Sequence, residues 1–582
     1  MKQFSLLAIA LMAILLTMCS DENKIQPVAT ISLDPNSGSG KPGEVVTVNI
    51  AFSAPNGAKE LHVLANGVEE DIIDLAGVAS PTTYDYTVPA NASVGSIITL
   101  GFQVIDGQNF GSTIVNFTVN VGETLQGSIT ANTTLDAAQQ YIIKGQVFVE
   151  NGFTLTIPAG TILKGDKATK GTLVVKPGGK LESLGTANNP VVFTSAQPVG
   201  ARDRGDWGGI VMLGNAYINQ PAKPFIEGIT PQINYGNTIV EGATPTTNAT
   251  ENSGTITYTR IEYAGIELTP NNETNSLTMG AIGNGTTIDH VQVSFGGDDG
   301  FEWFGGTVDA KYLVSHSTWD DDFDSDFGWG GRVQFGLVVR NTFMADQSGS
   351  NAFESDNQGN GNPITNCDGT TNTGCTRGVF SNITVLGPRE IQTRTISANY
   401  QNAAHIRRRT AISIFNSYFS GYRIGIRLDD QGTLDNLNNS VSRHAFNVVS
   451  VPGSTRIGSS TSAADANFAT GLSAGDATAL ATYWTANMNG DFNTVAAATQ
   501  HTDIGVAGTL FWGASTTSTY PSNPDFRLVA GVGGANNLNT GADFTDTRLD
   551  AFFTDTTYKG AFSATVDWTD GWSEFQPLNK VY

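Results

Sequence analysis

Short stretches of alternating apolar and polar residues fill the chain from residue 28 to residue 121. They include VVTVNIAF, KELHVLANG, TYDYTVPA, SIITLGFQVID and STIVNFTVNV. A period of two is typical of strands with one buried face, and turns containing Pro, Gly or Asn separate these stretches at intervals of about 8 to 15 residues. The pattern predicts a β-sandwich of the immunoglobulin type at residues 28–121. This domain has no cysteine pair and no obvious catalytic group, so we expect a spacer.

The pattern changes after residue 122. Two or three short β-branched strands, broken by single Gly or Asn turns, now recur at an interval of roughly 25 residues. The units include YIIKGQVFVENGFTLTIPAGTILKG, GTLVVKPGGKLESLGTANNPVVFTSA, GTITYTRIEYAG, IDHVQVSFGG and AISIFNSYFSG. Such a period is typical of a solenoid, in which each unit buries its apolar face against its neighbours.

The segment GTLVVKPGGKLESLGTANNPVVFTS resembles the right-handed parallel β-helix of the pectate-lyase-like superfamily. The likeness extends over about residues 125 to 450, and we place the β-helix at residues 122–452. The resemblance implies a fold and not an activity, because this fold serves lyases, hydrolases, adhesins and inert stalks alike.

The repeat is lost from residue 453 onward. SAGDATALATYWTANMNG predicts a helix of about 12 residues, and the last segment, YKGAFSATVDWTDGWSEFQPL, is rich in aromatic residues. Because the end of a solenoid exposes apolar surface, we expect residues 453–582 to form a partly helical, aromatic cap on the last coil. The expected fold class is therefore all-β, with an N-terminal immunoglobulin-like sandwich, a right-handed parallel β-helix and this cap.

The N-terminus predicts export and lipidation. The apolar run LLAIALMAILL is too short to span a bilayer, so residues 1–18 read as a signal peptide. LTMC resembles a bacterial lipobox, which implies lipidation of Cys19, although Met18 departs from the usual small residue. The following SDEN looks like the acidic export tag of Bacteroidota surface lipoproteins. Residues 19–27 are then a lipidated tether, and the protein is expected at the cell surface, anchored in the outer membrane. Secretion without a lipid is the alternative.

Two further cysteines, Cys367 and Cys375, lie in the loop sequence NCDGTTNTGC. An exported protein is expected to join them in a disulfide. With six His and no HExxH or CxxC pattern, the chain offers little for a standard zinc site.

The overall charge narrows the range of partners. The formal net charge is -23, with 54 acidic and 31 basic side chains. Nucleic acid is excluded as a partner, because a phosphate backbone requires a basic surface. Cations and neutral or metal-bridged ligands fit better.

Acidic residues gather most densely in DDDFDSD, residues 320–326. We align the coils on one inward column, made by Phe301, Phe323, Phe353, Ile406 and Ile426. Strand alternation then gives a first outward column of Glu302, Asp324, Glu354, Arg407 and Arg427. The second outward column reads Phe304, Asp326, Asp356, Arg409 and Asp429.

Adjacent coils lie about 4.8 Å apart, so this alignment stacks carboxylates on carboxylates. At an effective dielectric constant near 20, each such pair repels by roughly 3 kcal/mol. A hard cation, a protonated carboxyl group or the flanking arginines can relieve the repulsion. We expect Ca²⁺ as the cofactor, and the candidate ligands are Asp322, Asp324, Asp326, Glu354 and Asp356. The alternative is a solvated turn face, since Asp and Asn are common in β-helix turns.

Aromatic and basic residues around this face are typical of a carbohydrate site. The candidate ligand-binding residues are Glu302, Trp303, Phe304, Trp319, Trp329, Arg407, Arg409 and Arg427. At least one tryptophan should instead be in the core, because Trp303 shares the parity of Phe301.

Two catalytic mechanisms fit the same face. The resemblance to polysaccharide lyases implies a Ca²⁺-bound uronate and an arginine base, Arg407 or Arg427. Glycoside hydrolysis instead needs paired carboxylates, for which Asp324, Asp326 and Asp356 are candidates. We favour binding of a polysaccharide or other extracellular ligand over catalysis, and an outer-membrane transporter is a candidate partner. A structural or adhesive surface protein is the remaining alternative.

Overall fold

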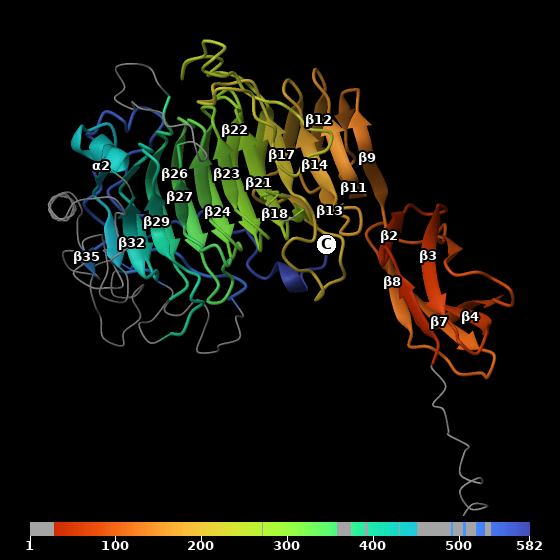
Figure 1. The fold of residues 1–582 in the computed structure, drawn as a ribbon. Helices are drawn as coiled ribbons and strands as arrows, with labels where there is room; N and C mark the ends of the chain where they lie inside the picture. The colour runs from red at the N-terminus through yellow and green to blue at the C-terminus, as the bar shows by residue number, and fades with distance from the viewer. Residues whose placement is uncertain are drawn as a thin grey trace, which may run out of the picture. The chain divides into compact units, whose positions relative to one another are not determined.

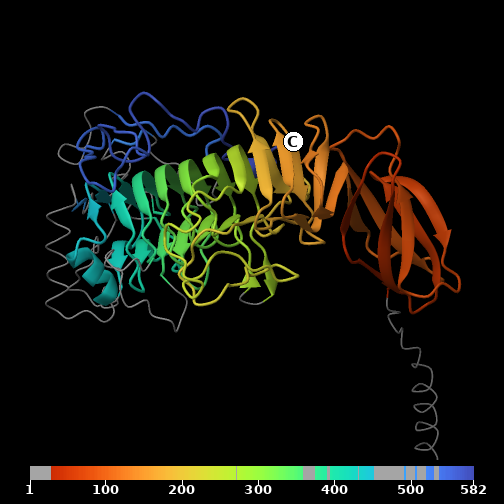
Figure 2. The same cartoon turned by 90° about the horizontal axis from the view of Figure 1, so that it is seen from above.

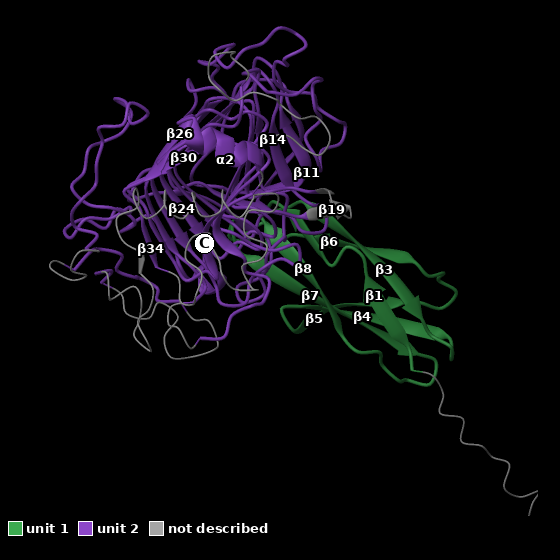
Figure 3. Ribbon diagram, turned by 60° about the vertical axis from the view of Figure 1, so that its left-hand side comes forward, with its two compact units in different colours: residues 1–121 green, residues 122–582 purple. Residues whose placement is uncertain are grey.

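The computed structural model describes most of the chain. The described residues are 28–269, 272–357, 374–389, 394–429, 431–450, 491–492, 505–507, 520–529 and 537–582. They divide into two compact units, residues 1–121 and 122–582 (Figure 3). The expected signal peptide, Cys19 and the predicted helix near residues 473–490 lie outside the described part.

The first unit is a β-sandwich, as the alternation predicted. One sheet has the strand order β1-β3-β6 and the other β2-β8-β7-β4-β5. Inward residues of both sheets, among them Val48, Val63 and Phe102, are fully buried. The strands are β1 (Thr30–Leu33), β2 (Ser37–Gly40), β3 (Val45–Ser53), β4 (Ala58–Ala65), β5 (Val68–Asp74), β6 (Thr82–Thr87), β7 (Ile97–Asp106) and β8 (Val115–Val121).

The second unit is a parallel β-helix, which confirms the predicted solenoid (Figures 1 and 2). Each full coil contributes to three stacked parallel ladders, which we call faces 1, 2 and 3. Face 1 contains β13 (Ile162–Gly165), β16 (Val191–Ser195), β31 (Tyr418–Ser420), β34 (Val448–Ser450) and β35 (Asp491–Phe492). Face 2 contains β10 (Thr133–Thr134), β12 (Thr154–Pro158), β15 (Lys180–Leu184), β30 (Ser413–Phe415) and β33 (His444–Ala445).

Five long strands pass from face 2 into face 1. They are β18 (Gly254–Glu262), β22 (Thr287–Ser294), β24 (Asp309–His316), β26 (Arg332–Val339) and β28 (Val379–Leu386). Face 3 contains β14 (Thr172–Val175), β17 (Ile210–Leu213), β21 (Leu277–Gly280), β23 (Phe301–Phe304), β25 (Phe323–Asp326), β27 (Phe353–Ser355), β29 (Asn402–Ile406) and β32 (Ile424–Leu428).

The first coil and the connections complete the unit. β9 (Glu123–Ile129) and β11 (Gln140–Val149) pair in parallel at its start, and β19 (Glu267–Thr269) and β20 (Asn272–Glu273) form a small hairpin. α2 (Gln431–Asn438) follows β32, and a 3-10 turn, η3 (Pro577–Asn579), lies near the C-terminus. Among the described residues, no helix has the length and apolar character needed to cross a membrane.

An aromatic column marks the corner between faces 2 and 1. Tyr258, His290, Tyr312 and Phe335 all have positive φ, a conformation that costs a residue with a side chain roughly 1–2 kcal/mol. Their rings stack at centroid distances of 4.3, 4.2 and 5.0 Å along the column. Each such contact contributes about 0.5–1.5 kcal/mol, so stacking offsets much of the backbone strain.

We expected residues 453–582 to cap the last coil, but the described residues 537–582, here called the C-terminal segment, run back along the side of the solenoid (Figure 2). Arg443 of the last coils binds Asp546, Gln334 donates to the Thr554 carbonyl, and Gln292 donates to that of Glu574. The physical reason is that the outer side of face 1 is itself apolar. Its residues form a second core with the segment, which includes Leu337, Leu386, Val448, Phe526, Phe562, Trp572 and Phe575.

This contact generates a stability prediction. Trp572 is 1% exposed and packs edge-on against Tyr258 and His290. Trp572→Ala should lower the free energy of unfolding by about 3–5 kcal/mol, measured by denaturant titration. Val566→Ala in the same segment should change it little, because Val566 is 57% exposed. Equal midpoints for the two variants would show that the segment is not part of the folded core.

Candidate functional site

The outer side of face 3 carries the predicted acidic ladder. Phe301, Phe323 and Phe353 are paired in register on successive strands and are buried. Glu302 pairs with Asp324, which pairs with Glu354, on the opposite side of the same strands. The predicted register is therefore confirmed for β23, β25 and β27.

The register prediction is wrong for the next coil by two residues. Glu354 is paired with His405 and Ser355 with Ile406, so Arg407 lies one step further along, beside Asp356. His405 in turn pairs with Arg427. A shift of two keeps every side chain on its face, so the apolar alternation alone could not distinguish Ala404 from Ile406 as the partner of the phenylalanine column.

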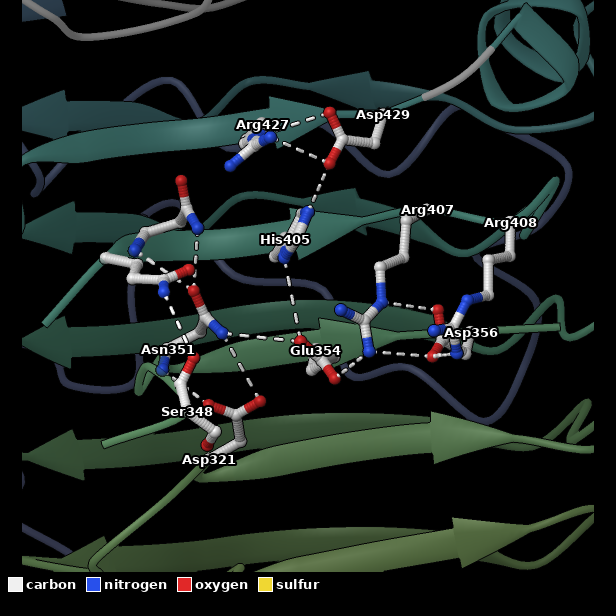
Figure 4. A network of polar contacts seen from close by, with 12 residues as sticks. Asp321, Ser348, Asn351, Glu354, Asp356, His405, Arg407, Arg408, Arg427 and Asp429 are labelled. Atoms are coloured by element: carbon white, nitrogen blue, oxygen red, sulfur yellow. Dashed lines mark hydrogen bonds and ion pairs between the residues drawn. The ribbon is translucent and has the colours of Figure 1, made fainter. Parts of the chain in front are cut away.

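The basic residues of this coil neutralise one end of the ladder (Figure 4). Arg407 binds Asp356 through two hydrogen bonds, from Nε to Oδ1 at 2.7 Å and from Nη2 to Oδ2 at 2.9 Å, and also binds Glu354. Arg408 makes a further contact with Asp356. Burial favours protonation of Glu354, but His405, Arg407 and Arg408 outweigh it and hold the Glu354 pKa below its usual value.

His405 links this end to the last coil of the face. Its Nε2 lies 2.6 Å from Oδ2 of Asp429, and its Nδ1 lies 3.6 Å from Oε1 of Glu354. Arg427 also binds Asp429. Glu354, Asp356 and Asp429 therefore all have cationic partners, and this half of the face is balanced in charge. We refer to these three acids and to His405, Arg407, Arg408 and Arg427 as the neutralised end.

The other end of the ladder has no such partners. Two sets of carboxylates place oxygens within 4.8 Å of one another: Asp298, Asp299 and Asp320, and Asp299, Glu302 and Asp324. None of these five, which we call the acidic centre, forms an ion pair with a described Lys, Arg or His. Glu302 is 7% exposed and Asp299 8% exposed, so these charges are largely removed from water.

The hydrogen bonds within the acidic centre are few. Asp299 accepts the Asp321 amide at 2.8 Å, and Glu302 accepts the side-chain amide of Asn275. The Oδ1 atoms of Asp320 and Asp324 are buried, and neither has a hydrogen-bond partner among the described residues. Unsatisfied carboxylate oxygens are costly, so these atoms are the ones best able to accept a bound cation.

Because these carboxyl groups are buried close together, their protonated form is favoured. Burial, followed by the charge of neighbouring carboxylates, raises the pKa of Asp298, Asp299, Glu302 and Asp324 well above the usual value. Burial and Asp346 raise the Asp320 pKa to about 7. Burial and Asp356 raise the pKa of Asp326, the next acid of the ladder, to about 8.

Asp322 does not belong to this site, contrary to the sequence-based expectation. Its side chain is fully buried, and Oδ1 accepts hydrogen bonds from Ser315 at 2.6 Å and Thr318 at 2.9 Å. Arg340, also fully buried, lies 3.3 Å away. Asp322 thus completes an internal polar cluster. It shares the parity of Asp324 and Asp326, but it precedes β25, which begins at Phe323, so strand alternation does not decide which way its side chain points.

The aromatic residues predicted to bind a ligand are partly in the core and partly near the surface. Trp303 and Trp329 are fully buried and stack on each other at 4.9 Å, so neither is available to a ligand on the outer face. Phe304 packs against Phe327 and against the insertion that follows β17. Trp319 is partly buried at the edge of the acidic centre, and its indole N–H donates to Asp346 at 2.7 Å.

Arg409 lies apart from the ladder. It has positive φ, and its amide donates to the hydroxyl of Thr433 in α2 at 3.0 Å. It therefore marks the turn after β29 and does not extend the second outward column.

Two insertions border the acidic face. Residues of the first, including Ile218, Ile226 and Tyr235, form an apolar cluster with Phe304 and with face 3 strands. Asn219 of this insertion donates to the Asn357 carbonyl at 2.8 Å, and the Tyr217 hydroxyl accepts the Gly374 amide at 3.1 Å. Residues 358–373 and Cys367 lie outside the described part, whereas Cys375 is buried and disulfide-bonded.

Sequence reasoning missed Asp298, Asp299 and Asp320 as members of the centre, because they lie in turns before the strands. A signal for them was present. Asp299 and Asp321 are separated by 22 residues, the same spacing that relates the paired Phe301 and Phe323. The pairs Asp298-Asp299 and Asp320-Asp321 therefore stack on successive coils in the same way as the phenylalanines.

The raised pKa values generate a prediction about pH. Asp320 and Asp326 bind protons more tightly when folded, so the stability they contribute is complete below about pH 4 and is lost as pH rises toward 7 to 8. With a chelator present, the melting temperature should fall from pH 5 to pH 8, each group contributing at most about 1.4 kcal/mol per pH unit.

Asp326→Asn should flatten this pH dependence, and the exposed Asp570→Asn should leave it unchanged. A melting temperature that rises between pH 5 and pH 8, or an unaltered slope in Asp326→Asn, contradicts the assignment.

Comparison with known proteins agrees with the architecture. A family model described as a pectate-lyase like beta helix domain matches residues 127–489. Among solved structures, the chain is similar to the fibronectin(III)-like modules of Clostridium thermocellum CbhA, at 12% identity and a TM-score of 0.13, over 16% of this chain and 96% of that one. No curated protein matches significantly. Because the family match spans more than half of the chain, this protein belongs to the family of pectate-lyase like β-helix domains.

Proposed function

We propose that the acidic centre of face 3 binds Ca²⁺ and, through the ion, a carbohydrate outside the cell. The observation that carries the proposal is the difference between the two ends of one ladder. Glu354, Asp356 and Asp429 have cationic partners, whereas the five carboxylates of the acidic centre have none among the described residues. A bound cation is the simplest way to balance a buried group of this kind.

The donor set favours calcium over softer metals. All candidate ligands in the acidic centre are carboxylate oxygens, and Ca²⁺ takes six to eight oxygen ligands in flexible geometry. The nearest histidine of the ladder, His405, is engaged with Asp429. The protein ligands leave coordination positions for water or a ligand oxygen, which is how a carboxylated or hydroxyl-rich sugar would be held.

The fold supports a carbohydrate ligand by analogy with the family, and the surroundings of the centre agree. Trp319 is partly exposed at the edge of the centre, with the Arg204 guanidinium over one face of its ring at 3.6 Å. Arg408, whose side chain is 38% exposed, lies at the neutralised end. A polysaccharide lying across the coils would meet a ring surface, a cation and a guanidinium in turn.

Binding is better supported than lyase chemistry. The lyase mechanism needs an arginine that can lose a proton. Arg407 is held by Asp356 and Glu354, which raise its pKa further above that of an ordinary guanidinium despite its burial. Arg427 is held by Asp429. Neither side chain is placed to act as a base.

Glycoside hydrolysis is the second candidate function. It requires a carboxylic acid that remains protonated near neutral pH, and Asp326, with its pKa raised to about 8, has this property. Asp324 would be the partner carboxylate. Asp356 is the weaker candidate, because Arg407 and Arg408 both bind it.

The site predicts a specific response to calcium. The full-length protein in detergent should bind Ca²⁺ saturably in a calorimetric titration. Asp324→Asn should weaken binding at least tenfold, because it removes a charged ligand of the acidic centre. Glu354→Gln should have a much smaller effect, since Glu354 already has basic partners. Equal losses in the two variants, or no binding by the unaltered protein, would exclude the proposed centre.

The unaltered protein and the Asp324→Asn and Asp326→Asn variants distinguish the candidate functions. A binder should retain an acidic polysaccharide column only with Ca²⁺ and release no product. A hydrolase should generate new reducing ends and lose this activity in Asp326→Asn. A structural or adhesive protein should show neither behaviour and should tolerate both substitutions.

We further propose that the protein is an outer-membrane lipoprotein, anchored through Cys19 and facing outward, where it could serve an outer-membrane transporter. The sequence LTMC, which resembles a lipobox and ends at Cys19, supports the proposal. Cys19→Ser should abolish incorporation of labelled fatty acid and move the protein from the membrane pellet to the soluble or periplasmic fraction. Cys375→Ser serves as a matched cysteine control and should leave lipidation intact. Labelling that persists in Cys19→Ser would refute the anchor.

A further inference from the structure

A cavity of about 440 Å³ lies between the turns that follow face 1 and residues 575–579, which include η3. The turns at residues 202–204 and 341–344 form its other sides, and Trp319, which precedes Asp320 of the acidic centre, also lines it. Its volume is within the usual range for small-ligand sites. The cavity is complete only because the C-terminal segment runs back along the coils.

A nearly buried side-chain amide provides a free hydrogen-bond donor in the cavity lining. Asn341 is 7% exposed, and its Oδ1 accepts the Phe343 amide at 2.9 Å. Because a backbone N–H must meet an oxygen, this bond fixes which end of the carboxamide is the NH₂ group. The Nδ2 atom has no hydrogen-bond partner among the described residues, and it is not sealed from solvent. This donor is therefore open to a ligand in the cavity.

The C-terminal segment supplies a free acceptor to the same cavity. Gln576 donates through Nε2 to the Tyr520 carbonyl, which leaves Oε1 as its acceptor. In the described part of the chain, Oε1 likewise has no hydrogen-bond partner, and it is not sealed from solvent. The lining thus presents one donor and one acceptor that the protein itself does not satisfy.

Two large apolar side chains of the lining remain exposed. Phe343 is 49% exposed and forms no ring contact with a described residue, and Leu578 is 39% exposed. Phe295, a third apolar member of the lining, is held by stacking on Tyr263 at 5.5 Å. The face of an aromatic ring carries partial negative charge, so it attracts the C–H groups of a ring-shaped ligand.

The charged side chains of the lining are already balanced. Arg204 lies over the Trp319 ring at 3.6 Å, and the carboxylate of its neighbour Asp203 accepts the Arg204 amide at 2.8 Å. Arg202 is engaged elsewhere, because its Nη1 donates to two carbonyls of the C-terminal segment at 2.8 and 2.9 Å, and it interacts with the buried Glu262 carboxylate. A ligand of this cavity therefore has no charge to neutralise.

We propose that this cavity binds one uncharged sugar ring, with its hydroxyl groups on Asn341 and Gln576 and its C–H face against Phe343. A hydroxyl group both accepts and donates, so the hydroxyls of one ring satisfy the free Nδ2–H and the free Oε1 together. A carboxylate or phosphate only accepts, and it would face the Gln576 oxygen without a proton to share. An ammonium group only donates. The site uses no metal ion, so it adds a second carbohydrate contact that can be tested apart from the calcium of the proposed function.

Saturation-transfer NMR on the full-length protein in detergent, with excess chelator, tests the ligand class without a contribution from calcium. The probes are methyl β-D-glucoside, methyl β-D-galactoside and methyl α-D-mannoside. At least one should bind saturably, at least fivefold more tightly than cyclohexylmethanol, which lacks the ring hydroxyls, and no more weakly than methyl β-D-glucuronide. Absence of saturable binding by all three, equal binding of cyclohexylmethanol, or tighter binding of the glucuronide would overturn the proposal.

Two variants test the residues. Asn341→Asp keeps the oxygen that accepts the Phe343 amide and replaces the free donor by an acceptor, so affinity for the bound glycoside should fall at least tenfold. Phe343→Ala should lower it at least fivefold while the melting temperature holds, because Phe343 is half exposed. Phe110→Ala removes a phenylalanine of similar exposure from the first unit and should change neither quantity. Unchanged affinity in Phe343→Ala would overturn the site even if Asn341→Asp failed to fold.

Discussion

In-register stacking of parallel coils is the constraint on which the rest of this structure depends. Backbone hydrogen bonding fixes adjacent strands about 4.8 Å apart, so residues at matched positions become neighbours whatever their chemistry. On the inner side this brings Phe301, Phe323 and Phe353 together as a stabilising stack. On the outer side the same pairing forces Glu302, Asp324 and Glu354 together. The apolar stack and the carboxylate ladder therefore cannot be separated, because a slip of one residue would exchange them.

The repulsion between stacked carboxylates is relieved differently at the two ends of face 3. At the neutralised end, arginines and a histidine from the following coils supply charge from within the fold. At the acidic centre, no described cation forms an ion pair with the carboxylates, and the Oδ1 atoms of Asp320 and Asp324 are buried without hydrogen-bond partners among the described residues. A scaffold with no ligand could have neutralised the whole face with arginine and histidine side chains. In the proposed function, the cation-dependent part of the face is therefore confined to the few coils that carry the acidic centre.

The fold was largely predictable because its signals are local and periodic. Strand alternation identified the sandwich, and the coil repeat identified the β-helix and placed three coils in register. The register after the long insertion was not predictable, because Ala404 and Ile406 have the same parity and the coil length is no longer regular. The burial of Trp303 followed from its parity, whereas that of Trp329 depends on stacking between coils.

The C-terminal segment is placed beside the coils by contacts that no local sequence pattern predicts. The C-terminal segment contacts coils hundreds of residues earlier, and no period relates Trp572 to Tyr258 or Pro577 to Arg202. For this reason the apolar outer side of face 1 could not be foreseen. By contrast, the repeated Asp-Asp pairs of the acidic centre were visible, but only once a coil spacing had been assigned to turns as well as to strands.

The central claim, that the unneutralised carboxylates hold a cation, is tested most directly by anomalous diffraction from crystals soaked in a lanthanide that substitutes for Ca²⁺. The account predicts a strong peak coordinated by Asp299, Glu302 and Asp324, with or without a second beside Asp298 and Asp320. It also predicts no peak at Glu354 and Asp356, where arginines already provide the positive charge. A map without a peak at the acidic centre, or with the ion at the neutralised end, would contradict it.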